Sequence, residues 1–337
     1  MGGRLIGMRQ PLVTIADGAL LLAPAIDYLR SRDVRVCVLP TGTSALEAAE
    51  LSRGSIAVIV HELPMPRDTI ERLAGTLLIV RAGAGYNTVD VAAAAEHGVW
   101  VANVPDYCTD EVADHTLMLL LAISRRLRAM ESLARSDPWT YRETLPEVHR
   151  IRGHRLGIVG LGAIGREVAR RALAFDWEVV AADPRAEDPN FEAPVGVQIV
   201  GLDELFTSSD AITLHCPLTR ETLRLVNVER LNSMRRGAII INTSRGALVD
   251  LSAVKGALGE GRLGGLGLDV ADGEPSPELD SSLTSHPGVV VTPHLAWYSI
   301  ESRRDLAIHA AEEALRVIRG EPPRHAVNIP VSASGQR

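Results

Sequence analysis

Short apolar runs alternate with helical patterns along the first hundred residues of the chain. Five runs have the length and composition of strands, at residues 12–15, 34–39, 56–60, 77–80 and 99–104. Alanine-rich helical patterns at residues 44–52 and 89–97 lie between them. Regular alternation of this kind predicts a parallel sheet that is covered by helices on both faces.

A second alternating series begins after residue 104. It opens with a helical pattern over residues 110–129, whose apolar positions cover more than one face. A helix that is apolar on most sides is buried on most sides, so we expect it in a core or against a second copy of the chain. Further runs typical of strands follow at residues 211–215, 238–241, 265–270 and 289–291. A last helical pattern, residues 301–319, comes after this series ends.

A glycine motif lies inside the second series. Gly160, Leu161, Gly162, Ala163, Ile164 and Gly165 follow the apolar run 156–159 and precede a helical pattern. A second apolar run, residues 179–182, ends in Asp183, eighteen residues after the last glycine. A strand, this glycine loop, a helix and a second strand that ends in an acid are typical of dinucleotide-binding units. A glycine-rich strand-to-helix turn with no nucleotide is the alternative.

Each residue of this unit has a physical role in the dinucleotide interpretation. Gly160 permits the tight turn, Gly162 allows the backbone to approach a pyrophosphate, and Gly165 allows the helix to pack closely on the sheet. The phosphates would lie on the helix N-terminus, which favours anions. Asp183 would accept hydrogen bonds from the ribose hydroxyls and repel a 2′-phosphate, so NAD is expected in preference to NADP. Arg185, two residues further on, would soften that preference.

The two series predict an α/β protein with two Rossmann- or flavodoxin-like, doubly wound parallel-sheet domains. Because the last helix follows the second series, we expect the nucleotide-binding domain to be inserted into the other one. The expected substrate-binding domain is residues 1–104 plus 297–337, and the expected NAD-binding domain is residues 105–296.

Composition excludes several classes of protein. The net charge of −7 argues against nucleic-acid binding, which needs a dense basic surface. The longest apolar stretch, residues 117–123, is too short to span a membrane, and no secretory leader is apparent, so we expect a cytoplasmic protein with no membrane partner. The cysteines Cys37, Cys108 and Cys216 are too widely spaced for a metal or disulfide framework, and no metal is expected.

Three polar residues come just after strands of the second series, where open α/β sheets bind ligands. They are Arg245, Glu274 and His294. Reduction of a 2-oxo acid requires a cation for the carboxylate, a proton donor for the carbonyl oxygen and an anion beside that donor. Arginine suits the first role and histidine the second, and Glu274 would stabilise the imidazolium. Taken singly, each residue also has an ordinary structural explanation.

These residues and motifs resemble the D-2-hydroxyacid dehydrogenase family over nearly the whole chain. The likeness rests on Asn242-Thr243-Ser244-Arg245-Gly246, on Glu274-Pro275 and on Thr292-Pro293-His294. It implies that Gly83, Ala84 and Gly85 bind the substrate carboxylate through backbone N–H groups. It also implies cofactor contacts at Thr116, His215, Cys216, Pro217, Thr222, Thr243, Ser244 and Asp269, the last to the nicotinamide carboxamide. The expected activity is NAD-dependent interconversion of a D-2-hydroxy acid and its 2-oxo acid.

Within the family, the chain is most similar to the C-terminal-binding proteins. The segment Pro293-His294-Leu295-Ala296-Trp297-Tyr298-Ser299 carries this likeness, which implies that Trp297 walls the substrate pocket. In one departure, Tyr86 is followed by Asn87-Thr88, where that group has Asp-Asn. Two alternatives stay open: an NAD-sensing scaffold of the corepressor kind, and a dehydrogenase of the same fold acting on phosphite. Formate is disfavoured, because formate dehydrogenases carry glutamine in place of Glu274.

Overall fold

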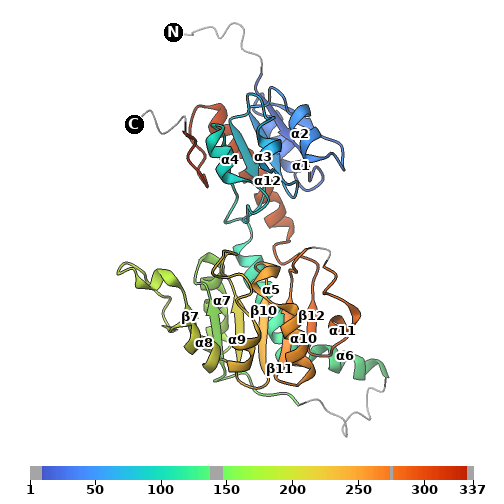
Figure 1. The fold of residues 1–337 in the computed structure, drawn as a ribbon, viewed down its shortest axis with the longest axis vertical. Helices are drawn as coiled ribbons and strands as arrows, with labels where there is room; N and C mark the ends of the chain where they lie inside the picture. The colour runs from blue at the N-terminus through green and yellow to red at the C-terminus, as the bar shows by residue number, and fades with distance from the viewer. Residues whose placement is uncertain (1–9, 137–146, 274–275, 332–337) are drawn as a thin grey trace. The chain divides into compact units, whose positions relative to one another are not determined.

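The computed structural model describes residues 10–136, 147–273 and 276–331. The chain forms two compact units, the first made of Met1–Cys108 with Tyr298–Arg337 and the second of Thr109–Trp297 (Figure 1). The second unit is therefore inserted into the first. Within the described residues, no helix is both long and apolar enough to cross a bilayer.

The first unit is built on a five-stranded parallel sheet in the order β2-β1-β3-β4-β5. Its elements are β1 (Leu12–Ile15), α1 (Ala23–Arg30), β2 (Arg35–Val38), α2 (Ala45–Leu51), β3 (Ala57–Val60), α3 (Arg67–Ile70), β4 (Leu78–Arg81), α4 (Val91–Glu96), β5 (Trp100–Ala102) and α12 (Ile300–Ile318). Helices α1 and α12 pack together on one face, and α2, α3 and α4 cover the other. The central strand β3 is buried along its whole length, because helices cover both faces of the sheet.

The end of the chain is joined to this sheet by polar contacts. Helix α12 begins at a capping box, in which Ser299 and Ser302 bond reciprocally. Near its end, the buried Glu313 carboxylate accepts hydrogen bonds from the backbone N–H groups of Arg324 and His325. Asn328 then accepts a hydrogen bond from the N–H of Val101. These contacts explain why residues far apart in sequence form one unit.

The second unit contains a seven-stranded parallel sheet in the order β12-β11-β10-β9-β6-β7-β8. Its strands are β6 (Arg155–Val159), β7 (Glu178–Ala182), β8 (Val197–Ile199), β9 (Ala211–Leu214), β10 (Ala238–Asn242), β11 (Leu263–Leu268) and β12 (Val289–Val291). Its helices are α5 (Thr109–Ser124), α6 (Leu127–Ser136), α7 (Ala163–Ala174), η2 (Pro184–Glu187), α8 (Leu202–Ser208), α9 (Val228–Ser233), η3 (Gly246–Leu248), α10 (Leu251–Gly259) and α11 (Ser281–Thr284). This strand order is typical of a dinucleotide-binding fold. The direction in which successive strands are added to the sheet reverses between β6 and β9.

Two apolar cores lie on the two faces of this sheet. One includes residues of α5 and α7, and the other includes residues of α8, α9 and α10. Both predicted α/β sheets are thus present and parallel, which confirms the predicted fold class. In open sheets of this kind, ligands bind beyond the carboxyl ends of the strands, where the order reverses.

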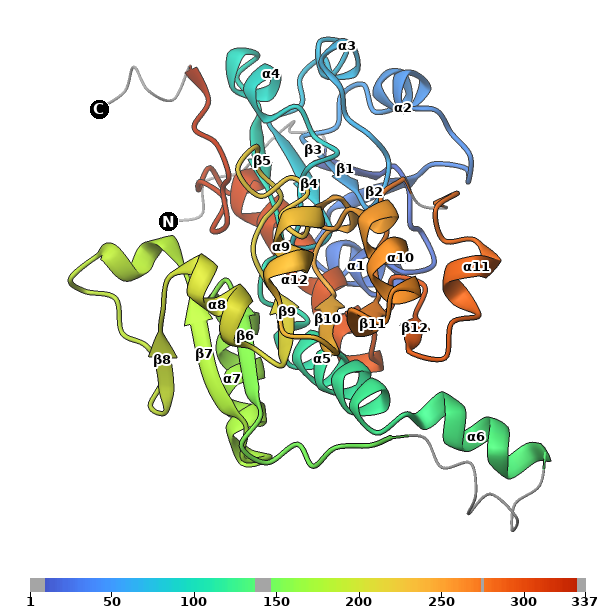
Figure 2. The same cartoon turned by 60° about the horizontal axis from the view of Figure 1, so that its bottom comes forward.

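The helix expected over residues 110–129 is in fact two helices. Helix α5 ends at Ser124, and Arg126 adopts a left-handed conformation with φ of 53° before α6 begins. The Arg126 guanidinium donates to the carbonyl of Gly264, which holds the turn against the sheet. Figure 2 shows α6 extending away from the sheet of the second unit. The apolar periodicity of the sequence runs on through Arg126 and therefore predicted one helix, although the left-handed conformation of this residue separates α5 from α6.

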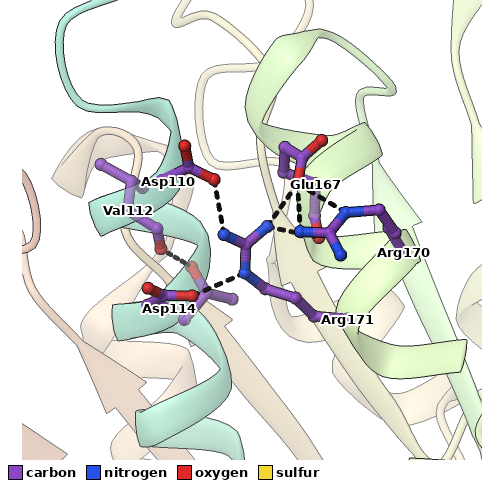
Figure 3. A network of polar contacts seen from close by, with 7 residues as sticks. Asp110, Val112, Asp114, Glu167, Arg170 and Arg171 are labelled. Atoms are coloured by element: carbon purple, nitrogen blue, oxygen red, sulfur yellow. Dashed lines mark hydrogen bonds and ion pairs between the residues drawn. The ribbon is translucent and has the colours of Figure 1, made fainter. Parts of the chain in front are cut away.

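An ion-pair network joins α5 to the dinucleotide helix α7 (Figure 3). Arg171 on α7 donates to the carboxylates of Asp110 and Asp114 on α5, each at 2.6 Å, and to Glu167 on its own helix. Burial lowers the pKa of Arg171, but the hydrogen bonds to these carboxylates outweigh it and raise the pKa above its usual range. Arg171 therefore fixes how α5 lies along α7.

Candidate functional site

The glycine loop lies at the point where the strand order of the second sheet reverses. Gly160 follows β6 with φ of 92°, and a Cβ at this position would lie 2.6 Å from the His215 carbonyl oxygen. A Cβ on Gly165 would lie 2.1 Å from the Gly160 carbonyl oxygen. Around Gly162, by contrast, only one described atom comes within 4 Å of a Cβ, the Arg185 Nη2 at 4.0 Å. The loop thus has a tight turn, close helix packing and an open backbone face, the three features that a bound pyrophosphate requires.

Asp183 stands at the end of β7, next to this loop. Its carboxylate accepts a hydrogen bond of 2.7 Å from the N–H of Leu161, and the side chain is only 4% exposed. Arg185 donates to both carboxylate oxygens. Its hydrogen bonds lower the pKa of Asp183 to about 2, although burial acts in the opposite direction. Asp183 is therefore an anion beside the glycine loop, as the sequence predicted, but it is already paired.

His215, Cys216 and Pro217 follow β9 and border the same loop. The His215 N–H donates to Val159 at 2.7 Å, and its Nε2 lies 2.9 Å from the Thr213 hydroxyl. Burial lowers the pKa of His215 to about 3 and raises that of Cys216 to about 11, so the pair is an uncharged imidazole and a thiol. The Thr222 hydroxyl donates to the Pro217 carbonyl at 2.7 Å and closes the turn.

Arg245 lies in the turn that follows β10. The Asn242 side-chain amide donates to the Arg245 carbonyl at 2.8 Å, and the Ser244 hydroxyl donates to the Leu214 carbonyl at 2.7 Å. These bonds fix the turn to the ends of β10 and β9. A Cβ on Gly246 would lie 1.9 Å from the backbone of Ala271, so the turn packs directly on the segment after β11. The half-buried Arg245 guanidinium is thereby held at the carboxyl edge of the sheet.

His294 lies beyond β12 in a left-handed conformation, with φ of 57°. Non-glycine residues adopt this region rarely, and other contacts have to hold them in it. The His294 N–H donates to the Asp269 carbonyl at 2.8 Å. The Asp269 carboxylate accepts from the Thr292 hydroxyl at 2.6 Å and from the N–H groups of Leu295 and Ala296 at 3.0 and 2.8 Å. Asp269 therefore clamps the turn on both sides of His294.

This clamp gives Asp269 a role that the sequence did not indicate. Its side chain is only 2% exposed, and its oxygens are used by the turn that carries His294. These contacts make Asp269 a positioning residue for the turn that carries His294, and the contact with the nicotinamide carboxamide that the resemblance implies stays a prediction. The positioning role could not be read from the strand pattern, because it depends on hydrogen bonds from residues 292–296.

Two residues of α5, His115 and Thr116, contact residues of the site by hydrogen bonds. His115 Nε2 lies 2.8 Å from the Thr292 hydroxyl; because that hydroxyl donates to Asp269, the imidazole is the donor to Thr292. Burial lowers the pKa of His115 against the opposing effect of Asp269. Thr116, expected to contact the cofactor, is fully buried, and its hydroxyl is shared between Val112 and Thr243. Thr116 thus holds Thr243, and His115 is a supporting residue that no pattern in the sequence indicated.

The remaining predicted residues are placed as follows. Glu274 lies outside the described residues. The Trp297 indole N–H donates to the His294 carbonyl at 3.0 Å, so this side chain braces the same turn. Gly83, Ala84 and Gly85 belong to the first unit, where they follow β4.

The loop after β4 is shaped by its neighbours in the first unit. Gly83 has φ of 146°, and a Cβ there would overlap the Arg81 guanidinium, at 1.6 Å from Nη1. The Asn103 side-chain amide donates to the Ala84 carbonyl at 2.6 Å, and His61 Nδ1 lies 2.9 Å from the Ala82 carbonyl oxygen. Arg81 and His61 were not among the predicted site residues. Their signal was a basic side chain where an apolar run ends: His61 follows β3, and Arg81 is the last residue of β4.

Comparison with known proteins identifies the family. Residues 117–296 match the D-isomer specific 2-hydroxyacid dehydrogenase NAD binding domain. A glyoxylate reductase from Korarchaeum cryptofilum is 38% identical over 268 residues, which are 79% of this chain and 80% of that protein. The chain belongs to the D-isomer specific 2-hydroxyacid dehydrogenase family. The family match confirms the predicted NAD-binding domain and the predicted class, an NAD-dependent dehydrogenase.

Two further relatives show how far the likeness extends. The D-3-phosphoglycerate dehydrogenase of Archaeoglobus fulgidus is 33% identical over 307 residues, which are 91% of this chain but 57% of that longer protein. The NAD-complexed structure of a D-isomer specific 2-hydroxyacid dehydrogenase from Lactobacillus delbrueckii ssp. bulgaricus has a TM-score of 0.79 at 26% identity and covers 94% of this chain and 100% of that one. These relatives are named as dehydrogenases and reductases, and none is a C-terminal-binding protein. The narrower likeness to that subgroup is therefore unsupported.

Proposed function

We propose that this protein interconverts a D-2-hydroxy acid and its 2-oxo acid by hydride transfer with NAD. One observation carries the proposal: within one unit, the carboxyl edge of the sheet holds a glycine loop built for a pyrophosphate, Arg245, and a clamped, exposed His294. The family membership gives independent support, since its NAD-binding domain covers the same residues.

The residues beside the glycine loop fit a dinucleotide. The open backbone face at Gly162 and the N-terminus of α7 would hold the phosphates, and Asp183 would receive the ribose hydroxyls. The bound nicotinamide supplies or accepts the hydride. The same proposal includes the other predicted contacts on this edge, at His215, Thr222, Thr243 and Ser244.

The chain's own groups then bind and protonate the substrate. Arg245 would bind the carboxylate and polarise the carbonyl through its planar guanidinium. His294 would give a proton to the carbonyl oxygen during reduction and take it back during oxidation. The family resemblance implies that Glu274 is the anion that stabilises the His294 imidazolium, so Glu274→Gln should move the upper limb of the reductive pH–rate profile to lower pH.

The substrate class is a small 2-oxo acid. The related proteins are named glyoxylate reductase and D-3-phosphoglycerate dehydrogenase, which favours short and polar side chains. Trp297 favours a medium-sized apolar or thioether side chain instead, since an indole face suits such groups. Initial rates with glyoxylate, hydroxypyruvate, 3-phosphohydroxypyruvate and a thioether 2-oxo acid decide between these substrates.

We also propose a homodimer that forms through the second unit. Support comes from exposed apolar side chains along its first two helices: Met118 of α5 is 47% exposed, and Leu127 and Met130 of α6 are 56% and 38% exposed. Exposed apolar side chains in such a group are typical of association surfaces. Light scattering should give twice the mass of one chain, and Leu127→Glu together with Met130→Glu should halve it.

The activity is tested by comparing His294→Gln with His149→Gln. His149 is an exposed histidine that precedes β6, so its loss should leave turnover unchanged. His294→Gln should lower kcat by about 10²- to 10⁴-fold, the usual contribution of a positioned acid, while the Kd for NADH stays the same. Wild-type turnover in His294→Gln would place the acid elsewhere. If the wild type binds NADH but turns over neither a 2-oxo acid nor phosphite, the protein is an NAD-sensing scaffold.

A further inference from the structure

The carboxylate that should receive the cofactor's ribose is fully engaged by the protein itself. Asp183 Oδ1 accepts hydrogen bonds from the Arg185 backbone N–H at 2.9 Å and from its Nε at 3.0 Å. Oδ2 accepts from the Leu161 N–H and from Arg185 Nη2, each at 2.7 Å. A carboxylate has about four acceptor positions, so none is left for a ribose hydroxyl. A dinucleotide that uses Asp183 must therefore displace the Arg185 guanidinium.

The displaced guanidinium stays within the length of an arginine side chain from Asp183, because the two residues are only two positions apart. Its Nη2 already lies 4.0 Å from the position of a Cβ on Gly162, above the backbone face that would hold the pyrophosphate. A second guanidinium is anchored nearby: Arg166 Nε donates to the Leu161 carbonyl at 3.1 Å. Both cations approach the Phe191 ring, at 5.3 Å from its centroid for Arg166 and 5.9 Å for Arg185.

Two arginines and one aspartate therefore lie beside the glycine loop, where the ribose would bind, and the sum of their charges is positive. A site with Asp183 alone would repel a 2′-phosphate strongly. Here the ribose displaces the Arg185 guanidinium, a group that can bind a phosphate through two parallel hydrogen bonds.

We propose that Arg185, with Arg166 beside it, forms a phosphate-accepting subsite next to Asp183, so that the protein binds NADP(H) as well as NAD(H). Asp183 still favours NADH, but Arg185 reduces the difference in affinity between NADH and NADPH in two ways. NADH binding breaks the Asp183–Arg185 pair and offers the guanidinium no phosphate beyond the pyrophosphate that both dinucleotides carry. NADPH binding breaks the same pair and gives the guanidinium a dianionic phosphate. The inference rests on the proposed role of the glycine loop in binding dinucleotides.

Dissociation constants for NADH and NADPH, measured by calorimetry without substrate, test this subsite. In the wild type, both should bind, with NADPH weaker than NADH by no more than about tenfold. Arg185→Ala should weaken NADPH by roughly ten- to a hundredfold, the loss expected for one charged hydrogen-bonding partner, and should tighten NADH. The matched control is Arg236→Ala. Arg236 is exposed and precedes β10, so it lies at the amino ends of the strands, away from the glycine loop at their carboxyl ends. Arg236→Ala should change neither constant.

The salt dependence of binding adds a second measurement, which can be made on the wild type and on the variants. Binding of NADPH should fall more steeply with ionic strength than binding of NADH, because its extra contact is an ion pair. Arg185→Ala should make the two slopes equal. Arg185→Lys keeps the charge but loses the fork, so it should restore part of the NADPH affinity.

The outcomes separate this inference from the proposed function. If the wild type binds NADH and not NADPH, or if Arg185→Ala weakens both dinucleotides equally, the subsite is wrong while the dehydrogenase assignment stands. If both dinucleotides bind as expected and no 2-oxo acid is reduced, the subsite stands and the proposed activity is wrong. If neither dinucleotide binds, both are wrong.

Discussion

Replacing Gly165 with alanine is expected to destabilise the second unit and to weaken dinucleotide binding. The new Cβ would lie 2.1 Å from the Gly160 carbonyl oxygen and 3.4 Å from Ile158 Cγ2. The first contact is about 1 Å shorter than any real Cβ contact, and the atom it meets is backbone. Helix α7 must therefore move away from β6, which disturbs the loop whose N–H groups would hold the pyrophosphate.

The magnitude follows from two opposing effects. Overpacking that forces backbone shifts costs about 1–3 kcal/mol. Alanine in place of glycine in a helix returns about 0.5–1 kcal/mol. From the middle of both ranges, the net loss is about 1 kcal/mol in the free energy of unfolding, which lowers the urea midpoint by roughly 0.4 M for a slope of about 3 kcal/mol/M. The Kd for NADH should rise by at least about tenfold, since a misplaced loop loses charge-assisted bonds to the phosphates.

Gly256 offers a matched control in the same unit. It lies inside α10, and apart from the neighbouring backbone of that helix no described atom comes within 4 Å of a Cβ built there. Gly256→Ala should therefore leave NADH binding unchanged and raise stability by about 0.5–1 kcal/mol. Urea titrations and NADH titrations of both variants check the pair. Equal stability and equal NADH affinity in Gly165→Ala and the wild type would refute the close-packing argument.

Three further predictions concern the network, the pH dependence and the substrate wall. Arg171→Met should lower the free energy of unfolding by about 1–2 kcal/mol, and less at 1 M salt, whereas the more exposed Arg170→Met should cost less than about 0.5 kcal/mol; equal losses would mean that the contacts to α5 contribute nothing. Burial holds the pKa of His215 at about 3, below the unfolded value of about 6.5, so the unfolded chain binds an extra proton between these values and stability falls as pH drops from about 6.5 towards 3. His215→Gln should make stability depend less on pH. Urea titrations from pH 7.5 to 5 in which the variant loses as much stability as the wild type would contradict this. Trp297→Ala should shrink a preference of about tenfold for larger apolar 2-oxo acids while sparing glyoxylate reduction, and an equal loss of kcat/KM for both would leave Trp297 as a brace of the His294 turn.

The sequence predicted the strands of both sheets well, because each is a short apolar run between helical patterns. Residues 289–291 were expected as a strand and form β12. The sequence did not predict β8 (Val197–Ile199). This strand is short and partly exposed, so its residues do not form an apolar run. The sequence also joined α5 and α6 into one helix, since apolar periodicity cannot register a single left-handed residue such as Arg126.

The candidate site divides in the same way. The glycine loop, Asp183, Arg245 and His294 could be recognised from the sequence, because each depends on a strand end and on residues a few positions away. The sequence could not reveal that Asp183 is paired on all sides, since the pairing depends on the direction of the Arg185 side chain.

What the sequence determined by itself is the local chemistry: apolar runs that form buried strands, glycines where the backbone must turn or pack closely, and polar residues just beyond strand ends. What only the tertiary structure decided is which groups satisfy one another. The Thr292 hydroxyl reaches Asp269 across 23 positions, and His115 reaches Thr292 across 177. Buried polar groups must find hydrogen-bonding partners, and these partners come from whatever element packs nearby, at any distance in the sequence. The role of Asp269 as the clamp of His294 therefore became visible only when β11, β12 and α5 were brought together.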